Sequence, residues 1–296
     1  MKSSTQTMCF VILHYKDRKV TDACVRSILR MQEQERLSIV IVDNDIEKKE
    51  EQREAFANRY RKYPRITVLP VRENGGFSHA NNLGYRYAKE KLNASYIILL
   101  NNDIEFTQPD FPALLEKSYH THPCHVLGPD IIRQGTGEHQ NPMDTCLRTR
   151  AEAEYTVKMN RLALNCFPAA YPLLRWKLRR DEKQALARKK KNGHFYRAVQ
   201  KDIVPFGACL IFTPDYVERE TAAFFPETRF FYEEYLLARR CRQKGYHTLY
   251  DPSMKLLHES GSSTKQTYRS EKTRLRFMME RTMEAAEIYL ETMNGE

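Results

Sequence analysis

Four polar segments of this chain each follow a short apolar run, and their side chains are of the types that contact metal ions, phosphates and hydroxyl groups. The segments are His14-Tyr15, Asp43-Asn44-Asp45, residues 72–77 and Asn101-Asn102-Asp103. Any one of them has an ordinary explanation, because asparagine and aspartate side chains hydrogen-bond to their own backbone where strands turn. Four in succession favour a binding site over four unrelated turns.

Two acidic residues and a histidine in the second half of the chain are also suited to catalysis. Glu233 and Glu234 open a segment with helical spacing, where a carboxylate either takes a proton from a hydroxyl group or simply interacts with the helix dipole. His258 follows an apolar run, where it either forms a structural hydrogen bond or contacts a metal or phosphate. The residues alone leave both alternatives open.

The segments that must position these residues alternate between strand and helix. Apolar runs at 8–15, 37–43, 65–71 and 95–106 are typical of strands covered on both faces, and helical spacing follows at 20–31, 48–62 and 78–92. This alternation predicts an α/β fold with a doubly wound, mostly parallel sheet. Ligands bind at the carboxyl ends of the strands in such sheets, so the four polar segments should meet at one edge.

Composition limits the class of protein. The 296 residues suffice for one large domain or a domain with an insertion, and 48 basic against 38 acidic residues give a charge of +10. That charge suits a nucleotide, a nucleic acid or a phospholipid surface. Seven scattered cysteines, a short N-terminal apolar run and no apolar stretch of roughly 20 residues lead us to expect a cytoplasmic protein.

Six motifs together resemble a known enzyme family. They are VILHYKD (11–17), IVIVDND (39–45), VRENGGFSHANNLGYRYA (71–88), YIILLNNDIEF (96–106), VPFGACLIF (204–212) and the segment 224–263. In this order they resemble the inverting family 2 glycosyltransferases with the GT-A fold, especially the rhamnosyltransferase-like branch of bacterial surface-polysaccharide and capsule synthesis. The resemblance implies a GT-A type, Rossmann-like sheet and transfer of a sugar from UDP or dTDP to a glycan hydroxyl, on an acceptor that is lipid-linked.

The resemblance implies a role for each matching position. Glu234 would be the catalytic base, with Glu233 in reserve. The donor nucleotide would contact His14, Tyr15, Asp43, Arg72, Asn74, Gly76, Asn82 and Asn102. A divalent cation, Mn2+ or Mg2+, would bind Asp103, Asn101 and His258, and Ser260, Gly261 and Ser262 would close over the diphosphate. The acceptor is expected near His139, Gln140 and Asn141.

One position departs from the family pattern. Asn101 replaces the first aspartate of the D-x-D metal motif, so Asp103 is the stronger candidate for a direct ligand. One carboxylate fewer weakens binding of the cation, which would then depend on diphosphate oxygens and water.

The chain is expected to divide into four parts. Residues 1–132 and 203–263 form the nucleotide-sugar-binding and acceptor halves of the GT-A domain, 133–202 a basic, largely helical insertion, and 264–296 a C-terminal helix. From 171 to 201 the insertion carries many lysines and arginines interleaved with Leu173, Leu174 and Trp176. Such a segment is either a solvated helix or a peripheral contact with the anionic inner face of the cell membrane.

Three other functions remain as alternatives. A nucleotidyltransferase would need a Gly-rich phosphate loop after the first strand, which is missing. A nucleic-acid-binding module is disfavoured by the acids at the strand ends, so no nucleic acid is expected. A protein that binds sugar nucleotides without turnover stays open because of Asn101 and the Glu233-Glu234 pair. The sequence does not indicate the oligomeric state.

Overall fold

The computed structural model describes residues 6–73, 75–191, 195–259 and 270–294, with side chains except at 182 and 185–191. Its strands are β1 Met8–His14, β2 Leu37–Asp43, β3 Ile66–Pro70, β4 Tyr96–Asn101, β5 Ile104–Phe106, β6 Val126–Arg133, β7 Gln200–Lys201, β8 Cys209–Phe212 and β9 Thr248–His258. Its helices are α1 Arg18–Ile28, α2 Glu50–Asn58, α3 Gly76–Glu90, α4 Phe111–Thr121, α5 Arg150–Asn165, α6 Phe167–Lys191, α7 Pro214–Arg219, α8 Glu233–Gln243 and α10 Glu271–Glu291.

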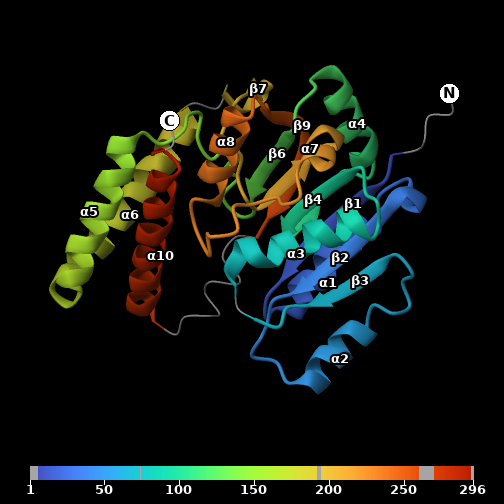
Figure 1. The fold of residues 1–296 in the computed structure, drawn as a ribbon, viewed down its shortest axis with the longest axis horizontal. Helices are drawn as coiled ribbons and strands as arrows, with labels where there is room; N and C mark the ends of the chain where they lie inside the picture. Colours follow the sequence, from blue (N-terminus) through green and yellow to red (C-terminus); the bar gives the residue numbers. More distant parts are fainter. Residues whose placement is uncertain (1–5, 74, 192–194, 260–269, 295–296) are drawn as a thin grey trace.

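One central sheet runs through the molecule in the order β3-β2-β1-β4-β8-β6-β9-β5, and β7 pairs with β9. Strands β1 to β4 are parallel, as are β6 and β9, whereas β8 is antiparallel to both β4 and β6. The predicted α/β fold with a mostly parallel, doubly wound sheet is confirmed (Figure 1).

Alternate residues of the central strands point into two separate cores. Phe10 and Ile12 pack with α1 and α4 on one face, while Cys9 and Val11 pack with α3 and α8 on the other. This two-sided burial explains why the strands are apolar at nearly every position.

The register of the parallel strands aligns their polar ends. His14 is opposite Asp43 across β1 and β2, and Leu13 is opposite Asn101 across β1 and β4. The backbone N–H of Asn44 also donates to the His14 carbonyl at 3.0 Å. The segments after β1, β2 and β4 therefore meet at one edge of the sheet.

The fourth predicted strand ends at Asn101, as the polar segment 101–103 indicated, and a second short strand that was not predicted begins at Ile104. The chain turns at Asn102 and Asp103, and β5 pairs antiparallel with the end of β9, where Ile104 lies opposite His258. A turn of asparagine and aspartate thus brings Asp103 beside a histidine that is 155 residues away in the sequence.

Helices α5, α6 and α10, here called the helical unit, lie together at one end of the sheet (Figure 1). Ala153 and Val157 of α5 pack against Ala286 and Tyr289 of α10, and Phe167 of α6 packs against Leu275 and Met279 of α10. Within the described ranges, no helix combines the length and the apolar character needed to cross a membrane.

Candidate active site

Asp103 and His258 form a buried pair at the ends of β4 and β9. Oδ1 of Asp103 lies 3.1 Å from Nε2 of His258, and Nδ1 of His258 lies 2.6 Å from Oε1 of Gln140. With Nδ1 donating to the amide oxygen, a neutral ring turns a lone pair toward the carboxylate. Two acceptors in that position need a proton or a cation between them.

These residues fit a divalent cation. Asp103 supplies a carboxylate and His258 an imidazole nitrogen whose other ring nitrogen is anchored by Gln140, the arrangement in which a second hydrogen bond orients a metal-binding histidine. Asn101 ends β4, half-buried, and adds an amide oxygen to the candidate donor set. Within the described ranges no cluster of three or more His, Cys, Asp or Glu side chains has the geometry of a metal site.

A hydrogen-bonded network joins the ends of β1, β2 and β4. Thr21 of α1 donates to the Asp17 carbonyl and accepts from Nδ1 of His14 at 2.6 Å and from Nδ2 of Asn102 at 3.0 Å. Nε2 of His14 then accepts from Lys48 Nζ at 2.9 Å, and Lys48 donates to Asp43 Oδ1 at 3.1 Å. His14 and Asn102 are thus buried orienting residues behind the edge.

The imidazole of His14 is neutral because of its surroundings. Its ring is stacked on Phe56 with the centroids 4.3 Å apart. Burial, together with the neighbouring Lys48 ammonium, lowers the pKa of His14 to about 3. The neutral ring can therefore accept the Lys48 hydrogen bond at physiological pH.

Lys48 was not among the site residues predicted from the sequence. It lies in the loop between β2 and α2, and its ammonium is also 4.4 Å from the Phe56 ring centroid and 3.9 Å from Asp45 Oδ2. A lysine among acidic residues normally indicates a surface ion pair. The one sequence signal for its contact with Asp43 is that Lys48 follows Asp43 by five residues, in the loop after the same strand.

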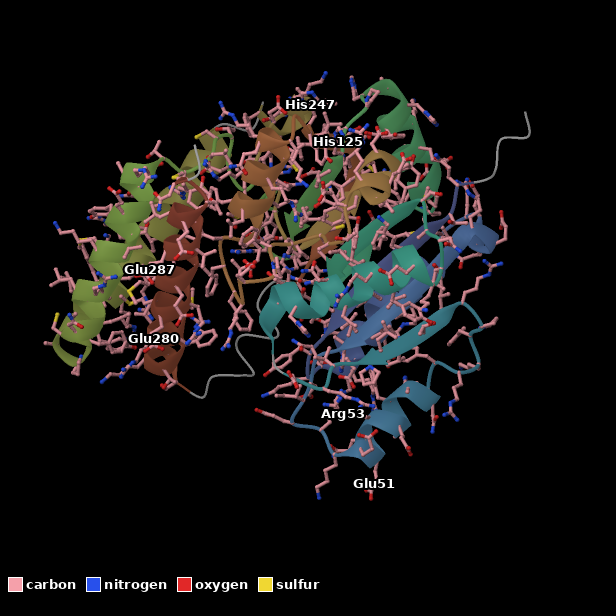
Figure 2. The ribbon with its side chains drawn as sticks, viewed as in Figure 1. Glu51, Arg53, His125, His247, Glu280 and Glu287 are labelled. Carbon is pink, nitrogen blue, oxygen red and sulfur yellow. The ribbon has the colours of Figure 1, made fainter. Side chains whose placement is uncertain are left out.

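The remaining predicted donor contacts are distributed around this edge. Tyr15 is half-buried and Arg72 is exposed. Arg53 of α2 (Figure 2) donates to the carbonyls of Val71 and Asp45, which fixes the loops that follow β3 and β2. Asn74 and the predicted phosphate-closing residues Ser260, Gly261 and Ser262 lie outside the described residues.

Gly76 and Asn82 both contact the segment that precedes α8. Gly76 has φ +84°, and a Cβ there would lie 2.4 Å from the Arg229 carbonyl oxygen. The Asn82 amide donates to the Phe224 carbonyl at 3.0 Å and accepts from the Phe224 N–H at 2.9 Å. Both positions hold α3 against the segment before α8, and we leave Asn82 out of the donor site.

Glu233 and Glu234 begin α8 after an unusual backbone turn. Phe231 and Tyr232 have φ values of +69° and +61°, a left-handed conformation that costs non-glycine residues about 1–3 kcal/mol each. Burial, together with the neighbouring Glu234 carboxylate, raises the pKa of Glu233. Burial likewise raises the pKa of Glu234. The turn therefore places two carboxyl groups where the ionised form is costly.

The short segment 206–208 joins both groups of acidic residues. The Gly207 N–H donates to Glu234 Oε1 at 3.1 Å, and the Ala208 carbonyl accepts from the Asn101 N–H at 3.0 Å. The Phe206 ring centroid lies 6.0 Å from that of His258. Segment 206–208 is therefore hydrogen-bonded to Glu234 on one side and to the end of β4 on the other.

The three predicted acceptor residues have three different environments. Gln140 orients His258, as described above. Asn141 is fully buried and binds the Pro129 carbonyl and the Phe206 N–H. His139 is partly exposed, hydrogen-bonded to Asp130 at 2.7 Å and stacked on Tyr196. Of the three, His139 alone combines exposure with a polar ring, so we retain it as the acceptor candidate.

Comparisons with known proteins agree with this architecture. S. aureus TarS 1-349 aligns with a TM-score of 0.51 and 11% identity over 98% of this chain and 74% of that one. The mannosyltransferase PcManGT from Pyrobaculum calidifontis, solved with GDP-Man and Mn2+, aligns with a TM-score of 0.53 and 13% identity over 97% of this chain and 70% of that one. At these identities the similarity shows a shared glycosyltransferase fold, of the GT-A type.

A third solved structure matches less of the molecule. S. aureus TarS aligns at 14% identity and a TM-score of 0.37 over 44% of this chain, and this chain spans 22% of that one. No curated protein matches the sequence. The family model described as "Glycosyl transferase family 2" matches residues 9–180, more than half of the chain. The protein therefore belongs to glycosyl transferase family 2.

Proposed function

We propose that this protein is a metal-dependent, inverting glycosyltransferase that moves a sugar from a UDP- or dTDP-sugar to a hydroxyl of a lipid-linked glycan in bacterial surface or capsular polysaccharide synthesis. The observation that carries the proposal is segment 206–208, which links Glu234 to the end of β4 beside the Asp103–His258 pair. A base and an anion-stabilising centre at one edge are what glycosyl transfer needs. We assign donor binding to residues 1–132 and acceptor binding to 203–263.

A cation bound at Asp103 and His258 would stabilise the leaving group. Asp103 and His258 would hold a Mn2+ or Mg2+ ion, with Asn101 as a further ligand, and the ion supplies Lewis-acid stabilisation of the departing diphosphate. Gln140 keeps Nε2 of His258 directed at Asp103. PcManGT, whose fold is similar, was solved with Mn2+, which supports the same choice of cofactor here.

Glu234 would act as the base. Its free oxygen would take the proton of the acceptor hydroxyl as that oxygen bonds to the anomeric carbon and the carbon–phosphate oxygen bond breaks, with the electron pair leaving on the diphosphate. The raised pKa of Glu234 makes it a stronger base than an exposed glutamate. Glu233 is the reserve candidate.

The donor nucleotide would bind at the ends of β1, β2 and β3. Asp43 and Lys48 would contact the nucleobase of the donor. Tyr15 and Gly76 would border the pocket, and the exposed Arg72 would face the diphosphate. PcManGT was solved with a nucleotide sugar, GDP-Man, which supports a sugar nucleotide as the donor. The residues of this edge are consistent with either UDP or dTDP.

Calorimetric titration of UDP and dTDP, with and without Mn2+, tests the proposal. We expect metal-dependent binding of one of them in the wild type, lost in Asp103→Asn and kept in the control Asp110→Asn, whose carboxylate is exposed at the start of α4. Binding without donor hydrolysis would favour the alternative of a non-catalytic sugar-nucleotide-binding protein. Absence of nucleotide binding, with salt-dependent binding to generic DNA, would favour the nucleic-acid module.

A further inference from the structure

Large apolar side chains are exposed in one part of the molecule. Six are exposed among the described residues, and five of these lie on α5 and α6: Tyr155, Met159, Leu162, Leu173 and Trp176. The sixth, Ile46, is in the loop after β2. Scattered apolar residues are normal on a surface, but a concentration on two adjacent helices indicates a binding surface.

Helix α6 has two apolar faces. Its inner face, with Phe167, Tyr171, Leu174 and Leu178, packs against α10. Leu173 and Trp176 are 67% and 57% exposed, and at 100° per residue they lie on the opposite side of the helix from Leu174 and Leu178. Folding of the helical unit therefore explains the inner face, whereas Leu173 and Trp176 on the outer face pack against no other described element.

Cations surround the outer face of α6. The helix carries nine lysines and arginines against two acidic residues. Lys177 and Arg180 follow Leu173 at spacings of four and seven, on the same side, and Arg180 lies over the Trp176 ring at 5.0 Å. Lys177 and Lys183 are exposed, and neither forms an ion pair within the described part of the chain.

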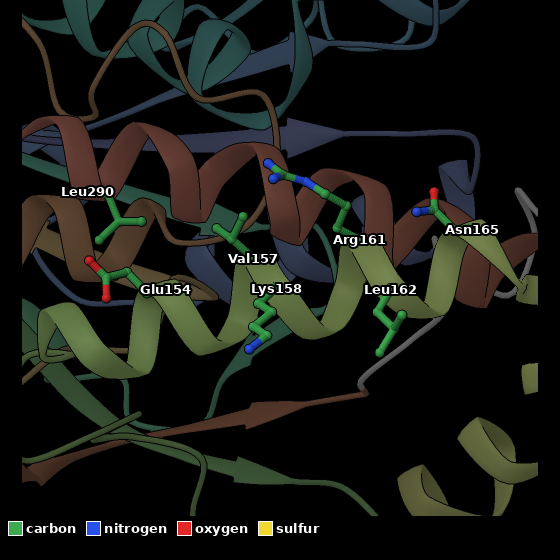
Figure 3. Close-up of a pocket in the computed structure, with 7 residues that line it drawn as sticks. All are labelled: Glu154, Val157, Lys158, Arg161, Leu162, Asn165 and Leu290. Carbon is green, nitrogen blue, oxygen red and sulfur yellow. The ribbon is translucent and has the colours of Figure 1, made fainter.

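Helix α5 also exposes apolar side chains on one side, although it carries three basic residues against two acidic ones and is less cationic than α6. Tyr155, Met159 and Leu162 follow one another at helical spacing on its exposed side. Nearby, a surface cavity of about 480 Å³ is lined by three apolar and four polar or charged side chains: Val157, Leu162, Leu290, Glu154, Lys158, Arg161 and Asn165 (Figure 3). Arg161 points toward α10, whereas Lys158 and Leu162 point away from it (Figure 3). Arg161 pairs with Glu287 of α10 at 2.6 Å.

We infer that the outer faces of α5 and α6 dock on an anionic phospholipid surface. Leucine and tryptophan next to unpaired lysines are the composition of helices that lie in a membrane interface, with the apolar side chains inserted and the cations at the headgroups. Each lysine or arginine near such a surface adds roughly 1 kcal/mol. The inference goes beyond the proposed transfer reaction and does not depend on it.

The single tryptophan of the chain makes the test direct, because Trp176 is the only source of tryptophan fluorescence. We expect its emission to shift to the blue, and the protein to co-sediment, with vesicles of phosphatidylglycerol and phosphatidylcholine at about one to two, but not with pure phosphatidylcholine. Added salt should weaken the partition. Lys177→Gln with Lys183→Gln should lower it by at least about tenfold.

Matched variants separate the docking surface from a general loss of structure. The variant Leu173→Ser should no longer show the blue shift of Trp176 emission. The double variant Leu173→Ser, Trp176→Ser should no longer co-sediment with the vesicles. The control Ile46→Ser should keep both the blue shift and the co-sedimentation. Thermal unfolding by circular dichroism should be unchanged, because the replaced side chains are exposed. Three results would overturn the inference. The protein could bind both kinds of vesicle equally, or neither kind. The blue shift could also occur without vesicles, in step with formation of a dimer.

Discussion

Gly207 and Glu234 are in direct contact: the Gly207 N–H donates to Glu234 Oε1 at 3.1 Å, and a Cβ at position 207 would lie 2.5 Å from that oxygen. The contact fixes one carboxylate oxygen, and the glycine is required by the close approach rather than by its φ angle. The position of the proposed base therefore depends on the absence of a side chain on a neighbouring segment.

Gly207→Ala should reduce turnover while leaving the donor site intact. The new methyl group displaces the Glu234 carboxylate, and a displacement of about 1 Å costs on the order of 10²-fold in kcat. The affinity for UDP or dTDP, measured by calorimetry, should change less than about twofold, since the donor residues lie after other strands. Glu234→Gln is the reference, and a Gly207→Ala enzyme as fast as wild type would exclude Glu234 as the base.

Gln140→Ala should weaken metal binding without removing a ligand. Loss of the amide that accepts from Nδ1 leaves the His258 ring free to rotate, and such orienting partners contribute about 10–100-fold in metal affinity. Titration of Mn2+ in the presence of the bound nucleotide measures the effect, with His258→Ala as the reference. A Gln140→Ala affinity equal to wild type would show that His258 acts outside the metal site.

Lys48→Met should reduce discrimination between UDP and CDP. Uracil presents a carbonyl oxygen beside an N–H, which complements one Lys48 donor and the Asp43 carboxylate, whereas cytosine presents an amino group in place of that carbonyl. We expect wild type to prefer UDP by at least about tenfold and Lys48→Met to lose most of that preference. If the ratio of the dissociation constants for UDP and CDP is unchanged in Lys48→Met, the nucleobase does not bind at Lys48.

His14 should make the protein less stable in mild acid. Its pKa is lowered to about 3 in the folded state, so the unfolded chain binds an extra proton between that value and about 6.5. The free energy of unfolding should therefore decrease as the pH falls, by about 2 kcal/mol between pH 7 and pH 5 from this group. Denaturant unfolding of His14→Gln should show a correspondingly smaller decrease, and parallel pH profiles for the two proteins would contradict the prediction.

Glu233 should give the free energy of unfolding the opposite pH dependence. Its pKa is raised by burial and by Glu234, so its contribution to stability is present at low pH and is lost as the pH rises through the raised value. Glu233→Gln should therefore lose less free energy of unfolding than wild type from about pH 5 to about pH 9. A Glu233→Gln profile as steep as the wild-type profile would mean that Glu233 is ionised at neutral pH.

Much of the fold followed from local patterns. The alternation of apolar runs with helical spacing predicted β1 to β4 and α1 to α3 in their correct order, because β1, β2 and β4 are buried on both faces. Strand β3 is only half-buried, but its residues are still mostly apolar. Individual boundaries shifted by one to several residues, as at α2, predicted at 48–62 and found at Glu50–Asn58. The end of β4 at residues 101–103 was predicted, but β5 was not, because this three-residue strand is defined by its pairing with β9.

The candidate site shows where local patterns end. Position after a strand made Asp43 and Asp103 candidates, and the family resemblance added roles for Glu234 and His258. The structure brings Asp103 beside His258 and Glu234 beside Gly207. The partners Lys48, Thr21 and Gly207 were not predicted, and the roles of Asn82 and Asn141 were different from those expected. Each of these depends on contacts between segments far apart in the chain, such as the 142 residues between Asn82 and Phe224.

The sequence by itself therefore determined which elements form and which residue types end the strands, since burial and periodicity act over a few neighbouring positions. The tertiary structure decided which of those side chains face a shared site and which are used within the protein. It did so through antiparallel pairing of β5 with β9 and through the approach of segment 206–208 to β4 and α8. These contacts depend on the close packing of the whole domain, which no local pattern encodes.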